Sequence, residues 1–294
     1  MSTWLNKHIK HVFIAPALLL TLALLVFPLA YTLYMSLTTW SGSAVKAPTF
    51  VGVTNFVKLL TTDARFMAAA GRTLLFTFVT VAVEIALGYA IALLLRKPFK
   101  GERVTRTLIL LPVVATPVAI SMAWMIIYDP NIGVANQLFQ AIGLQTQQFL
   151  ADPQGALWWL MVVDVWQWTP MIALILLAGL TSLPEEPYEA ALVDGATAWQ
   201  RFRFITFPLM IPAMFAAIVL RLVDSLKTFD IIYATTKGGP GYATETLNTY
   251  GFMQAFEYTN FGMASAVIML FILIVLVITL ITSKGNEMAG RTLK

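Results

Sequence analysis

The chain has 294 residues, of which 59% are hydrophobic and only 12% are charged. Soluble domains carry about 25% charged residues, so this composition excludes an ordinary soluble globular protein. The chain contains no cysteine, which excludes disulfides, thiol catalysis and cysteine-based metal sites, and its two histidines lie near the N-terminus. The net charge of +4 is modest and gives no reason to expect nucleic acid as a partner.

Six apolar segments are long enough to span a bilayer, which requires about 20 helical residues each. We therefore predict an all-α membrane protein with six transmembrane helices in a single domain, residues 1–294. The expected spans are residues 12–37, 72–95, 106–128, 157–182, 207–232 and 261–283. The first follows a short basic stretch and so also fits a signal peptide. Its apolar part exceeds the roughly 7–15 residues of a signal-peptide core, which favours an uncleaved anchor.

The distribution of Lys and Arg predicts the orientation, because cytoplasmic loops are enriched in these residues. The loop between the second and third spans carries five of them, Arg96, Lys97, Lys100, Arg103 and Arg106. The loop at 129–156 has neither Lys nor Arg, so we expect both termini in the cytoplasm (N-in, C-in). The first outer loop, which also carries basic residues, runs against this trend. Within it, residues Asn55–Leu60 fit either an amphipathic helix on the outer membrane surface or a plain connecting loop.

The loop between the fourth and fifth spans, residues 183–206, has the clearest local pattern. Pro187 suits the first turn of a short helix, because its missing N–H needs no partner there, and acidic residues beside it favour a helix N-terminus. Gly195 permits a sharp turn. A second short helix is expected after the turn, with Arg201 and Arg203 at its C-terminal end.

This segment resembles the EAA loop of ABC importer permeases, in which Glu-Ala-Ala is followed after three residues by Gly and later by a Pro before the next span. The matching residues are Glu189, Ala190, Ala191, Asp194, Gly195, Ala196, Phe202, Ile205, Pro208 and Pro212. The resemblance implies the type I (MetI-like) importer fold. It also implies that Glu189–Ala196 form a coupling helix, which docks in a cleft of an ATPase subunit. The alternative is an ordinary helical hairpin on the protein surface.

Residues around the fifth and sixth spans resemble the maltose-type, or carbohydrate uptake, branch of the same family. The matching segments are residues 50–53, 55–56, 229–233, 236–241, 244–247, 255–256 and 262–266. Taken alone, Gly238–Gly241 predicts only a turn. The tail Ser283–Lys294 lacks a glycine-rich ending, which resembles the first of the two permease types in this branch.

The resemblance implies an importer of a sugar, oligosaccharide, polyol, sugar acid or sugar phosphate in a bacterial or archaeal cytoplasmic membrane. The implied partners are a homologous second permease, an ABC ATPase dimer and a soluble or lipid-anchored solute-binding protein. No segment matches the Walker A pattern GxxxxGK[ST]. We therefore expect ATP and Mg²⁺ on the ATPase chains, and neither catalytic residues, cofactor nor metal site in this chain. The expected mechanism is alternating access, driven by ATP through the coupling helix.

Charged residues inside the spans are candidates for function, because a charge in a bilayer is costly. On the fifth span, four polar residues share one helix face by their spacing, and on the fourth span three residues do so. Hydroxyls, charged groups and an aromatic platform together suit a polyhydroxylated solute, and the resemblance places solute contacts on these two spans. The candidates are Glu84, Asp164, Gln167, Trp168, Met171, Arg221, Asp224, Ser225 and Thr228.

Other interpretations stay open. Arg221 with Asp224, or with Asp164, also fits a structural ion pair. If Arg221 faced the pathway, its guanidinium would suit an acidic or phosphorylated sugar. Among other classes of protein, an ion-coupled secondary transporter should show matching repeats, which we do not find, and an intramembrane enzyme needs a nucleophile and base, which are missing. The pattern at 229–266 disfavours a permease for a non-sugar solute.

Overall fold

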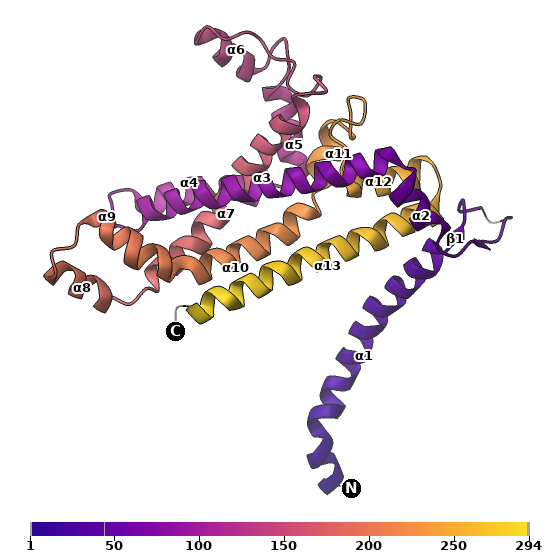
Figure 1. Ribbon diagram of the computed structural model, residues 1–294, viewed down its shortest axis with the longest axis horizontal. Helices are drawn as coiled ribbons and strands as arrows, with labels where there is room; N and C mark the ends of the chain where they lie inside the picture. Colours follow the sequence, from indigo (N-terminus) through magenta and orange to yellow (C-terminus); the bar gives the residue numbers. More distant parts are fainter. Residues whose placement is uncertain (1, 44, 293–294) are drawn as a thin grey trace. The chain divides into compact units, whose positions relative to one another are not determined.

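The computed structural model describes residues 2–43 and 45–292, and the regular secondary structure of the described chain is almost entirely helical (Figure 1). Its α-helices are α1 (Ser2–Ser36), α2 (Thr54–Thr61), α3 (Ala64–Leu95), α4 (Glu102–Val114), α5 (Pro117–Ile127), α6 (Val134–Ala141), α7 (Ala156–Thr181), α8 (Glu186–Val193), α9 (Ala198–Arg201), α10 (Phe207–Leu226), α11 (Asp230–Thr235), α12 (Leu247–Phe252) and α13 (Phe261–Thr292). The chain divides into two compact units, residues 1–66 with 251–273 and residues 67–250 with 274–294.

The first unit combines α1 with a short antiparallel pair of strands, β1 (Thr38–Thr39) and β2 (Thr49–Phe50). Asn55 anchors α2 to this pair, because its buried side-chain amide donates to the carbonyl oxygens of Ser36 and Thr38, both at 2.9 Å. The segment Asn55–Leu60 is therefore helical, as the amphipathic interpretation requires, and not an irregular loop.

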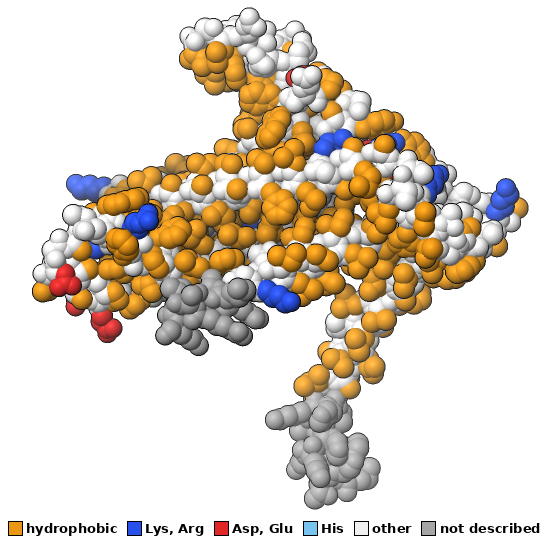
Figure 2. All heavy atoms as spheres, viewed as in Figure 1, with side chains coloured by type: hydrophobic (Ala, Val, Ile, Leu, Met, Phe, Trp, Pro, Cys, Tyr) orange, Lys and Arg blue, Asp and Glu red, His pale blue; other side chains and the backbone are white. Residues whose placement is uncertain are grey.

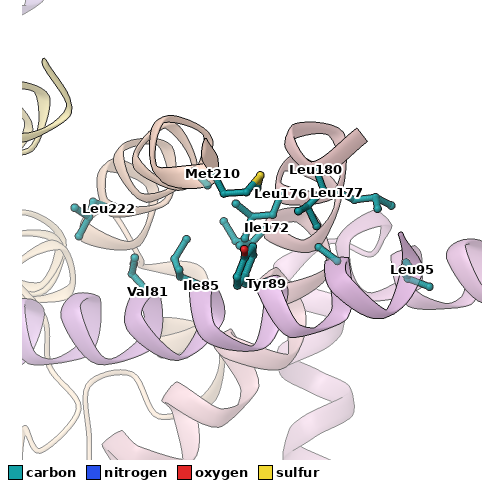
Figure 3. Packing of buried hydrophobic residues seen from close by; sticks show 12 residues of the cluster. Val81, Ile85, Tyr89, Leu95, Ile172, Leu176, Leu177, Leu180, Met210 and Leu222 are labelled. Carbon is teal, nitrogen blue, oxygen red and sulfur yellow. The ribbon is translucent and has the colours of Figure 1, made fainter. Parts of the chain in front are cut away.

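The second unit has a hydrophobic core between α3, α7 and α10. Val81, Ile85 and Tyr89 of α3 point toward α7 and α10, where their neighbours include Ile172 and Met210 (Figure 3). Helices α3 and α7 approach closely at Gly88, where an added Cβ would lie 2.7 Å from a methyl group of Ile172. A small residue at such a crossing allows two apolar helices to pack without a hydrophobic driving force from water.

The third expected span, residues 106–128, is not one straight helix. It consists of α4 and α5, whose axes differ by 96° across a short break. Ala115 and Thr116 are extended at this break, and the ring of Pro117 disfavours helical geometry in Thr116, the residue before it. The Thr116 hydroxyl then caps α5 by accepting from the Ala119 N–H at 3.4 Å.

The fifth expected span, 207–232, is also interrupted. A π-helix, η1 (Phe202–Thr206), leads without a break from α9 into α10, so the second helix of the loop does not end at Arg203 as expected. At its other end α10 stops at Leu226, and α11 begins at Asp230. Thr228 therefore lies in a connection, not on the helix face that its spacing predicted.

The expected spans 12–37 and 72–95 correspond to α1 and α3, which begin earlier than expected, at Ser2 and Ala64. Expected 157–182 corresponds to α7, and 261–283 lies within α13, which runs on through the tail to Thr292; Leu293 and Lys294 lie outside the described residues. Within the described chain, five helical segments are long and apolar enough to cross a membrane, or six if α4 and α5 form one bent span. Hydrophobic side chains cover most of the visible surface of these long helices (Figure 2).

Candidate functional site

A cluster of four charged residues from α3, α7 and α10 lies inside the second unit. Arg221 is fully buried, and its guanidinium forms two hydrogen bonds to Glu84, from Nε to Oε2 at 2.7 Å and from Nη2 to Oε1 at 3.0 Å. Nη2 also donates to Asp164, and Nη1 donates to Asp224 at 3.2 Å. One arginine thus joins carboxylates from three helices, and both ion pairs considered for Arg221 from the sequence are present.

The three carboxylates differ in their access to solvent. The side chains of Glu84 and Asp164 are 0% and 3% exposed, whereas that of Asp224 is 48% exposed. The indole of Trp168 lies against the guanidinium, with the Arg221 Cζ 5.2 Å from its ring centre, a cation–π distance. On the same side of α10, the hydroxyls of Ser225 and Thr80 are hydrogen-bonded at 3.2 Å.

A polar cavity of about 160 Å³ opens beside this cluster, where α10 ends and α11 begins. Five of the residues predicted from the sequence line it, namely Asp164, Gln167, Trp168, Asp224 and Thr228. It is completed by residues that the sequence analysis missed: Pro117, Lys227, Phe229, Asp230 and Ile231. They lie at the start of α5 and in the connection from α10 into the start of α11, next to two breaks that the hydrophobic pattern did not reveal.

The other candidates lie elsewhere. Glu84, Arg221 and Ser225 are buried next to the cavity but do not line it. Met171 packs against the hydrophobic core of α3, α7 and α10, so its shared face with Gln167 and Trp168 does not carry it to the cavity. Spacing on a helix places side chains on one face, but the neighbouring helices decide what that face meets at each level.

The loop at 183–206 forms a helical hairpin, α8 and α9, around Gly195. Gly195 has φ of +72°, a left-handed conformation that side chains other than glycine rarely adopt. Thr197 begins the second helix with a capping box, in which its hydroxyl accepts from the Gln200 N–H and the Gln200 side chain accepts from the Thr197 N–H. The hairpin exposes large apolar side chains; Leu192, Val193 and Trp199 are 57%, 88% and 65% exposed.

Tyr188 connects α8 to the rest of the second unit. Its hydroxyl donates to the hydroxyl of Thr206 in η1 at 3.0 Å, and Thr206 is buried. Its ring lies beneath the guanidinium of Arg96, at the end of α3, with 5.1 Å between Cζ and the ring centre. We call these three residues, Tyr188, Thr206 and Arg96, the hairpin clasp. Through it the exposed hairpin is attached to both α3 and the segment that leads into α10.

Apolar helices, an exposed hairpin attached to them and a polar cavity within them are typical of a subunit of a membrane transporter. A family comparison identifies which one: residues 84–283 match the model of the binding-protein-dependent transport system inner membrane component. The chain belongs to this family. It is a multi-pass ABC transporter permease of the cytoplasmic membrane, and such permeases are non-catalytic subunits.

Relatives of known assignment cover nearly the whole chain. The trehalose/maltose transport system permease protein MalF of Thermococcus litoralis is 35% identical over 277 residues, covering 93% of this chain and 92% of that protein. The trehalose transport system permease protein SugA of Mycobacterium tuberculosis is 32% identical, covering 99% and 94%. The multiple sugar-binding transport system permease protein MsmF of Streptococcus mutans is 30% identical, covering 96% and 97%.

Solved structures share the fold. A chain of a bacterial ABC transporter that imports the acidic polysaccharide alginate matches with a TM-score of 0.84 and 24% identity, over 100% of both chains. A chain of the MetNI methionine ABC transporter matches with a TM-score of 0.57 and 19% identity, over 76% of this chain and 95% of that one. The MetI-like permease fold expected from the EAA resemblance is therefore present.

Proposed function

We propose that this chain forms half of the translocation pathway of an ATP-driven, binding-protein-dependent importer for a carbohydrate or carbohydrate derivative. The observation that carries the proposal is the near full-length similarity to permeases named for trehalose, maltose and multiple sugars. The polar cavity supports it, because amide, carboxylate, hydroxyl and indole groups converge there. No observation favours an ion-coupled transporter or a non-sugar solute.

The proposed topology has six spans, with α4 and α5 together forming the third, and both termini in the cytoplasm. In this topology the whole chain is one transmembrane permease domain. The basic residues between α3 and α4 and the hairpin 183–206 then share the cytoplasmic side, which agrees with the contact of Arg96 with Tyr188. The loop that contains α6 and lacks Lys and Arg then faces outward.

The proposed assembly contains this chain, a homologous second permease, two ABC ATPase subunits and an external solute-binding protein. ATP and Mg²⁺ bind the ATPase subunits, so this chain has no ATPase site of its own. A neighbour of similar fold was solved with a pentasaccharide-bound periplasmic protein, which illustrates the last of these partners.

Coupling to the ATPase is assigned to the hairpin around Gly195. Its small residues allow close approach, and Leu192 and Val193 offer apolar area that becomes buried when a partner covers it. The proposed contact residues are Glu189, Ala190, Ala191, Asp194, Gly195 and Ala196. Closure of the ATPase dimer would move α8, and the hairpin clasp would pass this movement to α3 and α10.

Solute contact is assigned to the cavity and not to the whole candidate list. Asp164, Gln167, Trp168, Asp224 and Thr228 would meet the solute, whereas Glu84, Arg221 and Ser225 would support them from behind. The cavity is smaller than the roughly 300–1,000 Å³ of typical ligand sites, so in this conformation it would hold only part of an oligosaccharide.

A crosslinking experiment tests the assignment of the hairpin. The chain has no cysteine, so Ala191→Cys introduces a unique thiol on α8, and Ala151→Cys provides a control on the loop that contains α6. In the assembled importer, a short bifunctional reagent should join residue 191 to the ATPase subunit and leave residue 151 unjoined to it. Failure of Ala191→Cys to crosslink in an intact, active complex would refute the docking role.

A further inference from the structure

The hydrogen bonds of Arg221 decide what charge the cavity offers a solute. An arginine side chain has five N–H groups, and four of those of Arg221 donate to carboxylates, two to Glu84 and one each to Asp164 and Asp224. Its side chain is 0% exposed, and Trp168 lies against the guanidinium. An anionic solute would have to displace one of these carboxylates to bind Arg221. Displacing Glu84 or Asp164 would leave a buried carboxylate without its partner, and the approach to Nη1 passes Asp224, whose negative charge repels an anion.

Of the four ionisable residues that line the cavity, three are acidic and one is basic. The acidic residues are Asp164, Asp224 and Asp230, and the basic residue is Lys227, so the lining has a formal charge of −2. Behind it, Glu84 and Arg221 carry opposite charges that cancel. Because Asp224 is the most exposed carboxylate of the cluster, it contributes most directly to the field that an entering solute meets.

We propose that this cavity excludes anionic solutes, with Asp224 as the residue that determines the charge selectivity. The inference rests on the proposed function and narrows it: the solute is a sugar or polyol without carboxylate or phosphate groups. Trp168 offers an apolar surface and Gln167 an amide, so hydroxyl-bearing solutes need no charge to be held there. The interpretation of Arg221 as a binding site for acidic sugars is thereby replaced.

Charged thiol reagents test the field of the cavity without knowledge of the solute. The native chain has no cysteine, so Thr228→Cys places one thiol in the cavity and Ala151→Cys one on the loop that contains α6. In the complete importer, with cysteine-free partner subunits, each thiol is treated with the cationic reagent MTSET and the anionic reagent MTSES. At each position, the rate of reaction with MTSET is divided by the rate with MTSES. This ratio should be about tenfold higher at position 228 than at position 151, which corresponds to about 1.4 kcal/mol.

Variants assign this preference to Asp224. Asp224→Asn should bring the rate ratio at position 228 to within about threefold of the ratio at position 151, whereas Asp224→Glu should keep it high. Asp152→Asn, which removes a carboxylate that does not line the cavity, is the matched control and should leave the ratio of MTSET to MTSES rates at position 228 unchanged. An equal ratio at the two positions, a ratio unaffected by Asp224→Asn, or no reaction at position 228 would each overturn the proposal.

Uptake by the complete importer separates this inference from the function on which it rests. Liposomes are supplied with the binding protein and with matched pairs, namely trehalose with trehalose 6-phosphate and galactobiose with digalacturonate. Import of an anionic member as fast as its neutral counterpart would overturn the charge selectivity and leave a carbohydrate importer. Import of a non-sugar solute instead would overturn the proposed function, whatever the reagents report.

Discussion

Replacing Arg221 with methionine tests whether the charge cluster stabilises the helix bundle. The side chains of Glu84 and Asp164 are 0% and 3% exposed, so both would lose their cationic partner in the interior of the protein. Removing one partner of a buried ion pair costs about 3–5 kcal/mol. This is a large part of a typical folding free energy of roughly 5–15 kcal/mol, and it changes the folding equilibrium by about 10²–10⁴-fold.

Two further variants sharpen this prediction. Glu84→Gln in the Arg221→Met background removes one of the two uncompensated carboxylates, so it should recover part of the lost stability. Arg106→Met is the matched control, because the pair of Arg106 with Glu102, at 2.6 Å, has side chains 38% and 28% exposed. Ion pairs of this kind contribute only about 0–1 kcal/mol.

The assay is unfolding by SDS of the purified chain from lipid nanodiscs, followed by tryptophan fluorescence. The chain has eight tryptophans, and Trp168 lies against Arg221. The reasoning is refuted if Arg221→Met lies within about 1 kcal/mol of the native chain, the range of an exposed pair. It is equally refuted if Arg106→Met costs as much as Arg221→Met.

Two predictions concern the hairpin. Gly195→Val places a branched side chain at φ of +72° and should reduce the amount of ATPase that copurifies with the permease, whereas Gly195→Asn, which tolerates that conformation, should reduce it less; equal recovery with Val and native Gly would contradict this. Tyr188→Phe and Thr206→Val each remove the 3.0 Å hydrogen bond of the clasp and should lower solute transported per ATP hydrolysed. Because they break the same bond, the double variant should be no worse than either single one; additive losses would indicate separate roles.

Long apolar helices were predictable from the sequence because each stands out in hydropathy, whereas the breaks within the expected spans were not. Residues 157–182 were expected, and α7 runs from Ala156 to Thr181. The bend between α4 and α5 was missed although Pro117 was visible, because hydropathy averages over a window and does not register a change of direction. The end of α10 at Leu226 has neither Gly nor Pro to mark it, so it was not predictable from local signals.

The charged members of the cluster were predictable as individual residues, but their arrangement was not. A charge in an apolar segment is conspicuous, which identified Glu84 and Arg221 separately. They are 137 residues apart in the chain, and only the packing of α3 against α10 brings them together. The alternative uses of Arg221 could not be separated from sequence, because they depend on how many of its N–H groups other residues already occupy.

Helix α10 gives the clasp and the cluster a common mechanical element. Thr206 immediately precedes it and Arg221 lies on it, 15 residues further on, which corresponds to roughly 22 Å along an α-helix. A continuous helix resists bending far more than a loop does, so displacement of α8 would reach Arg221 as long as the Tyr188–Thr206 bond holds. Arg221 would in turn carry that displacement to Glu84 and Asp164, on α3 and α7. Such a connection couples the ATPase to the pathway only if the helices have two stable arrangements. The buried ion pairs favour discrete arrangements, because an arrangement of the helices between the two would leave Glu84 or Asp164 without its cationic partner.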